Sequence, residues 1–357
     1  SYNTAVGRAA LQNNTFGVYN TAVGRTSMQL NTTGKNNAAF GYSALKNNTV
    51  GNNNSAFGYQ SLISNVSGTQ NSAFGYRSLF SNTIGNENSA FGFKSLNSNT
   101  TGNYNTAVGH SALYANTFGI YNTAVGRSSL YSNTTGKFNS AFGYSALNAN
   151  IVGSKNSAFG YRALFSNTTN NNSAFGYKAL YTNTTGFVNS AFGYKALFLN
   201  TTGTGNTAVG NSSLHNNTTG SYNVSVGNGT LYANTIGSKN SAFGYGVLQF
   251  NTTGIDNSGF GYYALRSNTI GTNNNAFGSN ALRNNTTGDY NIAIGNRALF
   301  NNGISLSQDP RQSGEWNSTR NIAIGSSALM NNTTGFVNLK DFCLFAKMPF
   351  LNDKISS

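Results

Sequence analysis

The same pattern of apolar and polar residues repeats along this chain with a fixed period of 17 residues. The stretch Asn-Ser-Ala-Phe-Gly-Tyr, complete at Asn54 to Tyr59, returns with small changes from one end to the other. Copies begin at Asn3, step by 17 to Asn156, lose one residue before Asn172, continue to Asn291, and resume at Asn321 after a 13-residue insertion. A fixed period below about 50 residues predicts a stacked repeat array.

Numbered from its first asparagine, each of 19 copies has Asn at positions 1 and 12 and Gly at position 5. Position 9 is Leu except at Met28, position 3 is Ala except at Ser225 and Gly259, and position 4 is Phe, Val or Ile. Apolar stretches at positions 2–4 and 8–10, each followed by turn residues, predict two short strands per copy. Glycines at positions 5 and 15 are expected to supply positive φ at corners, and Asn170 to replace one of them.

A 17-residue unit is too short for a helical hairpin, so each strand is expected to pair with its copies about 4.8 Å above and below. The predicted fold class is all-β, a parallel β-solenoid of about 19 coils, with its asparagines in amide ladders. Because positions 3 and 4 face opposite sides, an inward position 4 leaves the Ala column outside, open to an identical chain. The predicted core columns, positions 9 and 4, include Leu130, Leu164, Phe159 and Phe175.

The repeat array is expected to form one elongated domain over residues 1–337, with an insertion loop at 302–320. Residues 338–357 leave the repeat and are predicted to be a C-terminal cap or tail. Loops on rigid scaffolds are favoured binding sites, which makes Trp316 and Arg311 in the insertion candidate binding residues. The alternative is a tolerated surface excursion.

Composition bears mainly on function. Lys and Arg outnumber Asp and Glu by 21 to 7, but only 8% of residues are charged and no basic run occurs, so no nucleic acid partner is expected. Cys343 is the single cysteine, and no apolar run approaches about 18 residues, which predicts no disulfide framework, no multi-cysteine metal site and no membrane insertion. His110 and His215 occupy different positions in distant copies. No catalytic residue, metal or cofactor is therefore predicted.

Two sets of polar residues are candidate contact or modification sites. Asn-Thr-Thr reads as an N-glycosylation acceptor at Asn31, Asn133 and Asn251, although position 12 stays Asn where that pattern is lost, which favours a structural ladder. At position 7, three consecutive copies carry a cation, which predicts a basic column that is either a solvated face or a contact for an acidic glycan. These three residues are Arg162, Lys178 and Lys195.

A longer rhythm overlies the 17-residue period. Position 4 is Val in two copies and then Phe in four, and position 6 is mostly Tyr in the Phe copies. Duplication of six-copy segments explains the copying. Positions 4 and 6 are two residues apart and can share one face of a strand. Their aromatic residues are therefore predicted to form bands that recur about every 29 Å, which is six rungs of about 4.8 Å.

Asn3-Thr-Ala-Val-Gly7 and Asn291-Ile-Ala-Ile-Gly295 resemble the Ser-Val-Ala-Ile-Gly type repeat of trimeric autotransporter adhesin heads, and related repeats occur in viral and bacterial tail-fibre-like proteins. The resemblance covers Asn3 to about Gly335. It implies a left-handed parallel β-roll, association of three rolls, and an extracellular adhesin.

The sequence thus predicts a non-enzymatic, extracellular fibrous protein, a structural filament or an adhesin, on a cell or virion surface. Its expected partners are copies of itself, as a trimer or filament, and cell-surface glycans or matrix. An ice-binding solenoid, for which position 13 offers a Thr column, and a glycan-binding solenoid are the alternatives.

Overall fold

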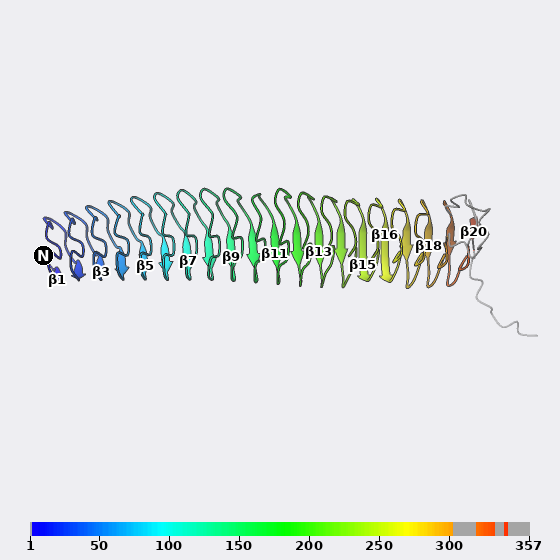
Figure 1. The fold of residues 1–357 in the computed structure, drawn as a ribbon, viewed down its shortest axis with the longest axis horizontal. Coiled ribbons are helices and arrows are strands. Elements are labelled where there is room, and N and C mark those ends of the chain that lie inside the picture. Colours follow the sequence, from blue (N-terminus) through cyan, green and yellow to red (C-terminus); the bar gives the residue numbers. More distant parts are fainter. Residues whose placement is uncertain (1, 303–318, 333–338, 342–357) are drawn as a thin grey trace, which may run out of the picture.

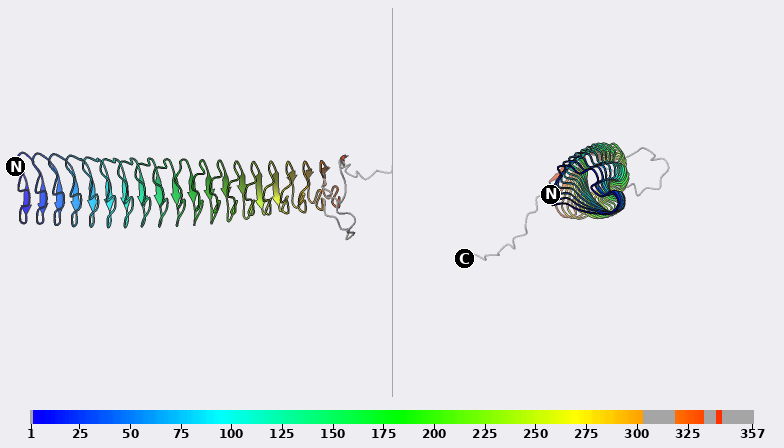
Figure 2. Two further views of the ribbon diagram at one scale, coloured as in Figure 1. Left: turned by 45° about the horizontal axis from the view of Figure 1, so that its top comes forward. Right: turned by 90° about the vertical axis from the view of Figure 1, so that its left-hand side faces the viewer.

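The computed structural model describes residues 2–302, 319–332 and 339–341, which form a long rod of stacked coils (Figure 1). Seen down the rod, successive coils nearly superpose (Figure 2). Among the described residues there is no helix, and the predicted all-β parallel solenoid with about 17 residues per coil is confirmed. The strands are β1 Thr4–Val6, β2 Thr21–Val23, β3 Ala38–Phe40, β4 Ser55–Phe57, β5 Ser72–Phe74, β6 Ser89–Phe91, β7 Thr106–Val108, β8 Thr123–Val125, β9 Ser140–Phe142, β10 Ser157–Phe159, β11 Ser173–Phe175, β12 Ser190–Phe192, β13 Thr207–Val209, β14 Val224–Val226, β15 Ser241–Tyr245, β16 Ser258–Tyr262, β17 Asn275–Phe277, β18 Ile292–Ile294, β19 Ile322–Ile324 and β20 Leu339–Asp341.

Each strand pairs in parallel with the next, with equivalent residues opposite one another. The register continues across the insertion, where Ile292 lies opposite Ile322, and β19 pairs with β20 at the start of the predicted tail. Hydrogen bonds between coils also lie outside the strands, as from the Leu164 N–H to the Ala179 carbonyl, 3.0 Å. The coil is therefore joined to its neighbours around most of its circumference.

Each coil contains one strand rather than the two expected. Positions 8–10 form turns, because positions 7 and 9 have left-handed φ angles, 53° at Arg162 and 51° at Leu164. Position 17 is left-handed too, as at Asn171 with φ 59°. Left-handed residues cannot continue an extended strand, so the second apolar stretch bends the chain around the core.

The core consists of small and medium side chains, and the predicted placement of position 4 is wrong. Leu130 and Leu164 are fully buried, and so is Ala158 at position 3. Phe159 and Phe175 lie on the outer face of the strand and are only partly covered. The position 9 Leu and position 3 Ala side chains form one buried cluster, and the position 4 rings lie outside it. The Ala column is therefore inside and cannot be the contact for another chain.

Exceptions to the repeat show that positions 3 and 8 meet inside the coil. Where position 8 carries the larger Val247, position 3 of the next coil is Gly259, and a Cβ there would lie 2.5 Å from the Val247 Cγ1. Where position 3 is Ser225, position 8 of the same coil is Thr230, and their hydroxyl oxygens are 2.6 Å apart. Each change of size or polarity is thus matched by its neighbour.

Two asparagine ladders run along the interior, as the sequence predicted. At position 12, the Asn133 Nδ2 donates to the Asn116 Oδ1 at 2.8 Å and to the Gly136 carbonyl at 3.1 Å. At position 1, the Asn139 backbone N–H donates to the Asn122 Oδ1 at 3.0 Å. Buried amides are costly unless they are hydrogen-bonded, so these bonds explain why neither position varies from copy to copy.

The two recurring glycine columns have different causes. Gly160 at position 5 has φ 132°, a region that residues with a Cβ avoid. Gly136 at position 15 does not have the expected positive φ; a Cβ there would overlap the Asn133 Oδ1 and the next coil's carbonyl oxygen. Close approach of backbone to the ladder therefore selects this glycine.

The short coil between Asn156 and Asn172 lacks position 14, and Asn170 does not replace the glycine. Thr169 takes that place, because its carbonyl accepts from the Asn156 Nδ2 at 2.7 Å. Asn170 lies at position 16, where its Oδ1 accepts from the Ser154 backbone N–H at 2.7 Å. The ladder is interrupted here, and the buried Asn150 Oδ1 has no hydrogen-bond partner.

Candidate interaction surface

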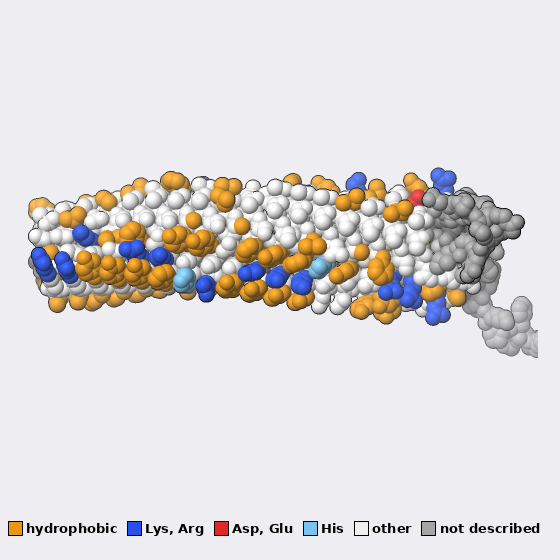
Figure 3. All heavy atoms as spheres, in the orientation of Figure 1, with side chains coloured by type: hydrophobic (Ala, Val, Ile, Leu, Met, Phe, Trp, Pro, Cys, Tyr) orange, Lys and Arg blue, Asp and Glu red, His pale blue; other side chains and the backbone are white. Residues whose placement is uncertain are grey.

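Aromatic side chains stack in several columns on the outside of the rod, and orange stripes run along one face (Figure 3). Two of these columns lie at positions 4 and 6. At position 4, Phe159 stacks on Phe142 and Phe175 with ring centroids 4.6 Å away on both sides. At position 6, Tyr161 stacks on Tyr144 and Tyr177 at 5.3 Å. The predicted bands therefore exist as continuous ring stacks. The three bands of position 4 are Phe40, Phe57, Phe74 and Phe91; Phe142, Phe159, Phe175 and Phe192; and Phe243, Phe260 and Phe277.

The stacking determines which part of each ring meets solvent. Most neighbouring rings are within about 10° of parallel along the rod, as for Phe142 on Phe159 at 8° and Tyr161 on Tyr177 at 8°, and Tyr245 lies at 17° to Tyr262. The ring faces are thus covered by other rings, and the edges and phenol hydroxyls point outward. Tyr161 still exposes 39% of its surface and Tyr194 47%. The columns offer ring edges to a partner, not open ring faces.

Arginines cover the first ring of two Tyr stacks. The Arg25 guanidinium lies 5.7 Å from the centroid of Tyr42, and Arg127 lies 6.0 Å from that of Tyr144. Both arginines occupy position 6 of the preceding Val coil. A cation over an aromatic face stabilises by about 0.5–1 kcal/mol at an exposed site, which gives a physical reason for the arginine that precedes these two bands.

The predicted basic column lies between two aromatic columns. Lys178 Nζ is 5.3 Å from the Tyr177 ring centroid at position 6 and 5.5 Å from that of Tyr181 at position 10. Arg162 and Lys195 have the same arrangement one coil before and after. The aromatic residues at position 10 were missed in the sequence, although they mostly accompany a cation three residues earlier. The cations of this column are therefore already partnered by rings.

The three candidate glycosylation residues are part of the interior. Asn31, Asn133 and Asn251 are fully buried, and each Nδ2 donates to the asparagine of the preceding coil at 2.7–2.8 Å. A glycan must be attached to this same Nδ2, so modification at these sites is incompatible with the fold. The structural interpretation of position 12 holds.

The Thr column at position 13 has few free donors. The Thr184 Oγ1 donates to the Thr201 carbonyl at 3.1 Å, and the Thr201 Oγ1 to the Thr218 carbonyl at 3.0 Å. Each hydroxyl thus continues the backbone hydrogen-bond pattern between coils. This column does not provide the array of free hydroxyls that the ice-binding alternative needs.

Charged groups are sparse on the described surface. The Glu87 carboxylate raises the pKa of the Tyr104 hydroxyl, and a hydrogen bond with Tyr263 raises the pKa of the Tyr262 hydroxyl. Both phenols therefore stay neutral near pH 7.

The other two candidate binding residues, Trp316 and Arg311, lie outside the described residues.

In residues 2–302, 319–332 and 339–341 there is no group of His, Cys, Asp and Glu suited to a metal ion. The same part of the chain has no helix with the length and apolar character of a membrane span. No family model, curated protein or solved structure matches the chain.

Proposed function

We propose that the protein is a non-catalytic structural or adhesive rod that associates with copies of itself through its aromatic columns. The observation that carries this proposal is the pair of exposed ring stacks on a stiff, continuously hydrogen-bonded scaffold. The resemblance to trimeric adhesin heads and tail fibres supports the same role, with lateral association and an extracellular or virion-surface location.

The size of the exposed apolar surface supports a contact function. The position 6 tyrosines expose about 40% of their surface and most position 4 phenylalanines expose less. With a ring residue surface of about 200 Å², one residue contributes at most about 80 Å². A band of four coils and two columns then presents at most about 600 Å², at the upper end of the largest apolar patch of ordinary monomers. Three bands on one rod exceed the roughly 800 Å² per partner of a standard interface.

The test combines shape with self-association. Small-angle scattering should show a rod of about 90 Å, 19 rungs of about 4.8 Å, whereas a radius of gyration near 20 Å would indicate a globule and refute the scaffold role. Sedimentation velocity should show concentration-dependent association of the wild type. A rod that remains monomeric at 0.1 mM would refute self-association.

Two double variants locate the contact. Phe159→Ser with Phe175→Ser removes two rings of a column, and association should weaken at least tenfold. Phe16→Ser with Phe118→Ser removes two exposed rings at position 14, neither of which belongs to a position 4 or position 6 column, and association should be unchanged. Equal effects of the two variants would refute the role of the columns, provided that circular dichroism shows both proteins folded.

A further inference from the structure

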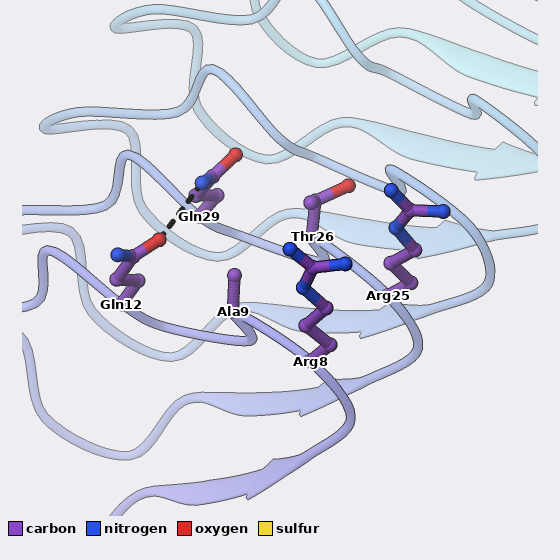
Figure 4. A pocket seen from close by; sticks show the side chains of 6 residues that line it. All are labelled: Arg8, Ala9, Gln12, Arg25, Thr26 and Gln29. Carbon is purple, nitrogen blue, oxygen red and sulfur yellow. Dashed lines mark hydrogen bonds between the residues drawn. The ribbon is translucent and has the colours of Figure 1, made fainter.

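Between the position 6 and position 10 columns, the first two coils contain a pocket of about 500 Å³ (Figure 4). Arg8 and Arg25 form one wall, and Gln12 and Gln29 form the other. Figure 4 shows the two guanidinium groups one above the other, on adjacent coils, on the same side of the open space. The volume lies within the range of small-molecule sites.

The pocket is open because its floor is small. Position 7 is Ala9 in the first coil and Thr26 in the second. In six later coils position 7 is a long cation, as at Lys178, which lies between the rings of Tyr177 and Tyr181. The first two coils thus keep the cations at the wall and leave the centre of the groove free.

The chemistry of the lining favours an anion. No acidic residue precedes Glu87 in the sequence, and Glu87 lies three coils beyond Arg25, so within the described part of the chain neither guanidinium has a carboxylate partner nearby. The Gln29 Nε2 donates to the Gln12 Oε1 at 2.8 Å, which fixes both amides and leaves the Gln12 Nε2 as a further donor at the wall. Guanidinium groups bind carboxylate and sulfate oxygens in charge-assisted hydrogen bonds.

We infer that this pocket binds the carboxylate or sulfate group of an acidic polysaccharide. Single-stranded nucleic acid fits less well, because it is bound largely by base stacking on open aromatic faces, and the ring faces here are covered. The inference deepens the proposed adhesive role, on which its biological meaning rests. The positive charge at position 6 of the Val coils decreases along the rod. Arg8 and Arg25 are followed by His110 and Arg127, and then by two asparagines.

The experiment measures binding of four probes by isothermal titration calorimetry at fixed salt. They are a sulfated chondroitin tetrasaccharide, its unsulfated carboxylate counterpart, inorganic sulfate and a dT 20-mer. The wild type should bind at least one of the acidic tetrasaccharides at least tenfold more tightly than the dT 20-mer, and the difference between the two tetrasaccharides identifies the anionic group. Binding of inorganic sulfate as tight as that of the tetrasaccharides would mean an adventitious ion site and overturn the inference, as would tighter binding of the dT 20-mer.

Three variants separate the pocket from the overall positive charge. Arg8→Gln with Arg25→Gln should weaken binding at least tenfold, whereas Lys137→Gln with Lys155→Gln, two exposed cations elsewhere, should change it less than twofold. The variant Ala9→Arg with Thr26→Lys adds two charges but fills the groove with the side chains that position 7 carries in other coils. Its binding should also fall at least tenfold; tighter binding would overturn the inference. A folded rod that binds none of the probes would overturn the pocket and leave the scaffold role intact.

Discussion

The inward position of Ala158 and the outward position of Phe159 can be tested by placing the same charge at each. Ala158 is fully buried between Ala141 and Ala174, its partners in the neighbouring strands. An Asp at 158 would place a carboxylate among methyl groups and Leu side chains with no cation near. An Asp at 159 would point toward solvent, and its cost would be the loss of two ring stacks.

The size of the effect follows from the protonation of the buried carboxyl. Burial raises a carboxyl pKa by as much as 3–5 units, so Ala158→Asp should fold with a neutral side chain at pH 7. Taking a proton from water at pH 7 onto a group with an unfolded pKa of about 3.9 costs about 1.36 kcal/mol per pH unit, or about 4 kcal/mol. Because the folded pKa is raised, this penalty is small below pH 4 and grows as the pH rises toward the folded pKa.

Denaturant unfolding between pH 3 and pH 8, followed by circular dichroism, gives the comparison. Ala158→Asp should lose about 4 kcal/mol of stability relative to Ala158→Asn over this range, since the Asn variant has nearly the same shape but no charge. Phe159→Asp should lose about 1–3 kcal/mol for its two stacking contacts, with no such increase in the penalty as the pH rises. A larger pH-dependent loss at 159 than at 158 would refute the orientation of the strand.

Three further changes probe backbone strain and the ladder by unfolding measurements. Val188 is a β-branched residue with φ 56°, so Val188→Asn should stabilise by about 1 kcal/mol, whereas Phe187→Asn, without that strain, should not. Inserting a glycine after Thr169 restores a 17-residue coil and should give the Asn150 Oδ1 its partner, with a gain of about 1–3 kcal/mol; no gain would refute the assignment of the missing position. Gly160→Ala forces a Cβ to within 2.8 Å of the next coil's carbonyl carbon and should cost at least about 2 kcal/mol; a neutral change would contradict the positive φ of this glycine column.

The repeat length, the parallel stacking and the two asparagine ladders could be predicted because each depends on residues that recur in every copy. The orientation of the strand could not be predicted from apolarity, since Ala and Phe are both apolar neighbours. The sequence does contain the needed signal in its exceptions. Ser225 and Gly259 at position 3 accompany Thr230 and Val247 at position 8, as expected of side chains in contact.

The left-handed residues and the candidate surface were harder to predict. The left-handed conformation of Leu164, with φ 51°, could not be recognised in the sequence, because a Gly or Asn would be expected at such a φ. Burial of the Leu side chain at position 9 offsets the free-energy cost of this backbone conformation. The pocket at Arg8 and Arg25 depends on the absence of a long side chain at position 7, and such an absence has meaning only once the columns on either side are known. The basic column of Lys178 was visible as a pattern, but its aromatic partners required the path of the chain.

The direction of the hydrogen bonds between coils has a mechanical consequence. Bonds such as that from the Leu164 N–H to the Ala179 carbonyl connect one coil to the next and thus lie along the rod. A force that pulls on the two ends loads them in tension, a few at a time, rather than shearing many together. The rod should therefore yield coil by coil from an end, and each released coil of 17 residues would lengthen the chain by about 50 Å. A tether built in this way resists bending yet absorbs a sudden pull in small, equal steps.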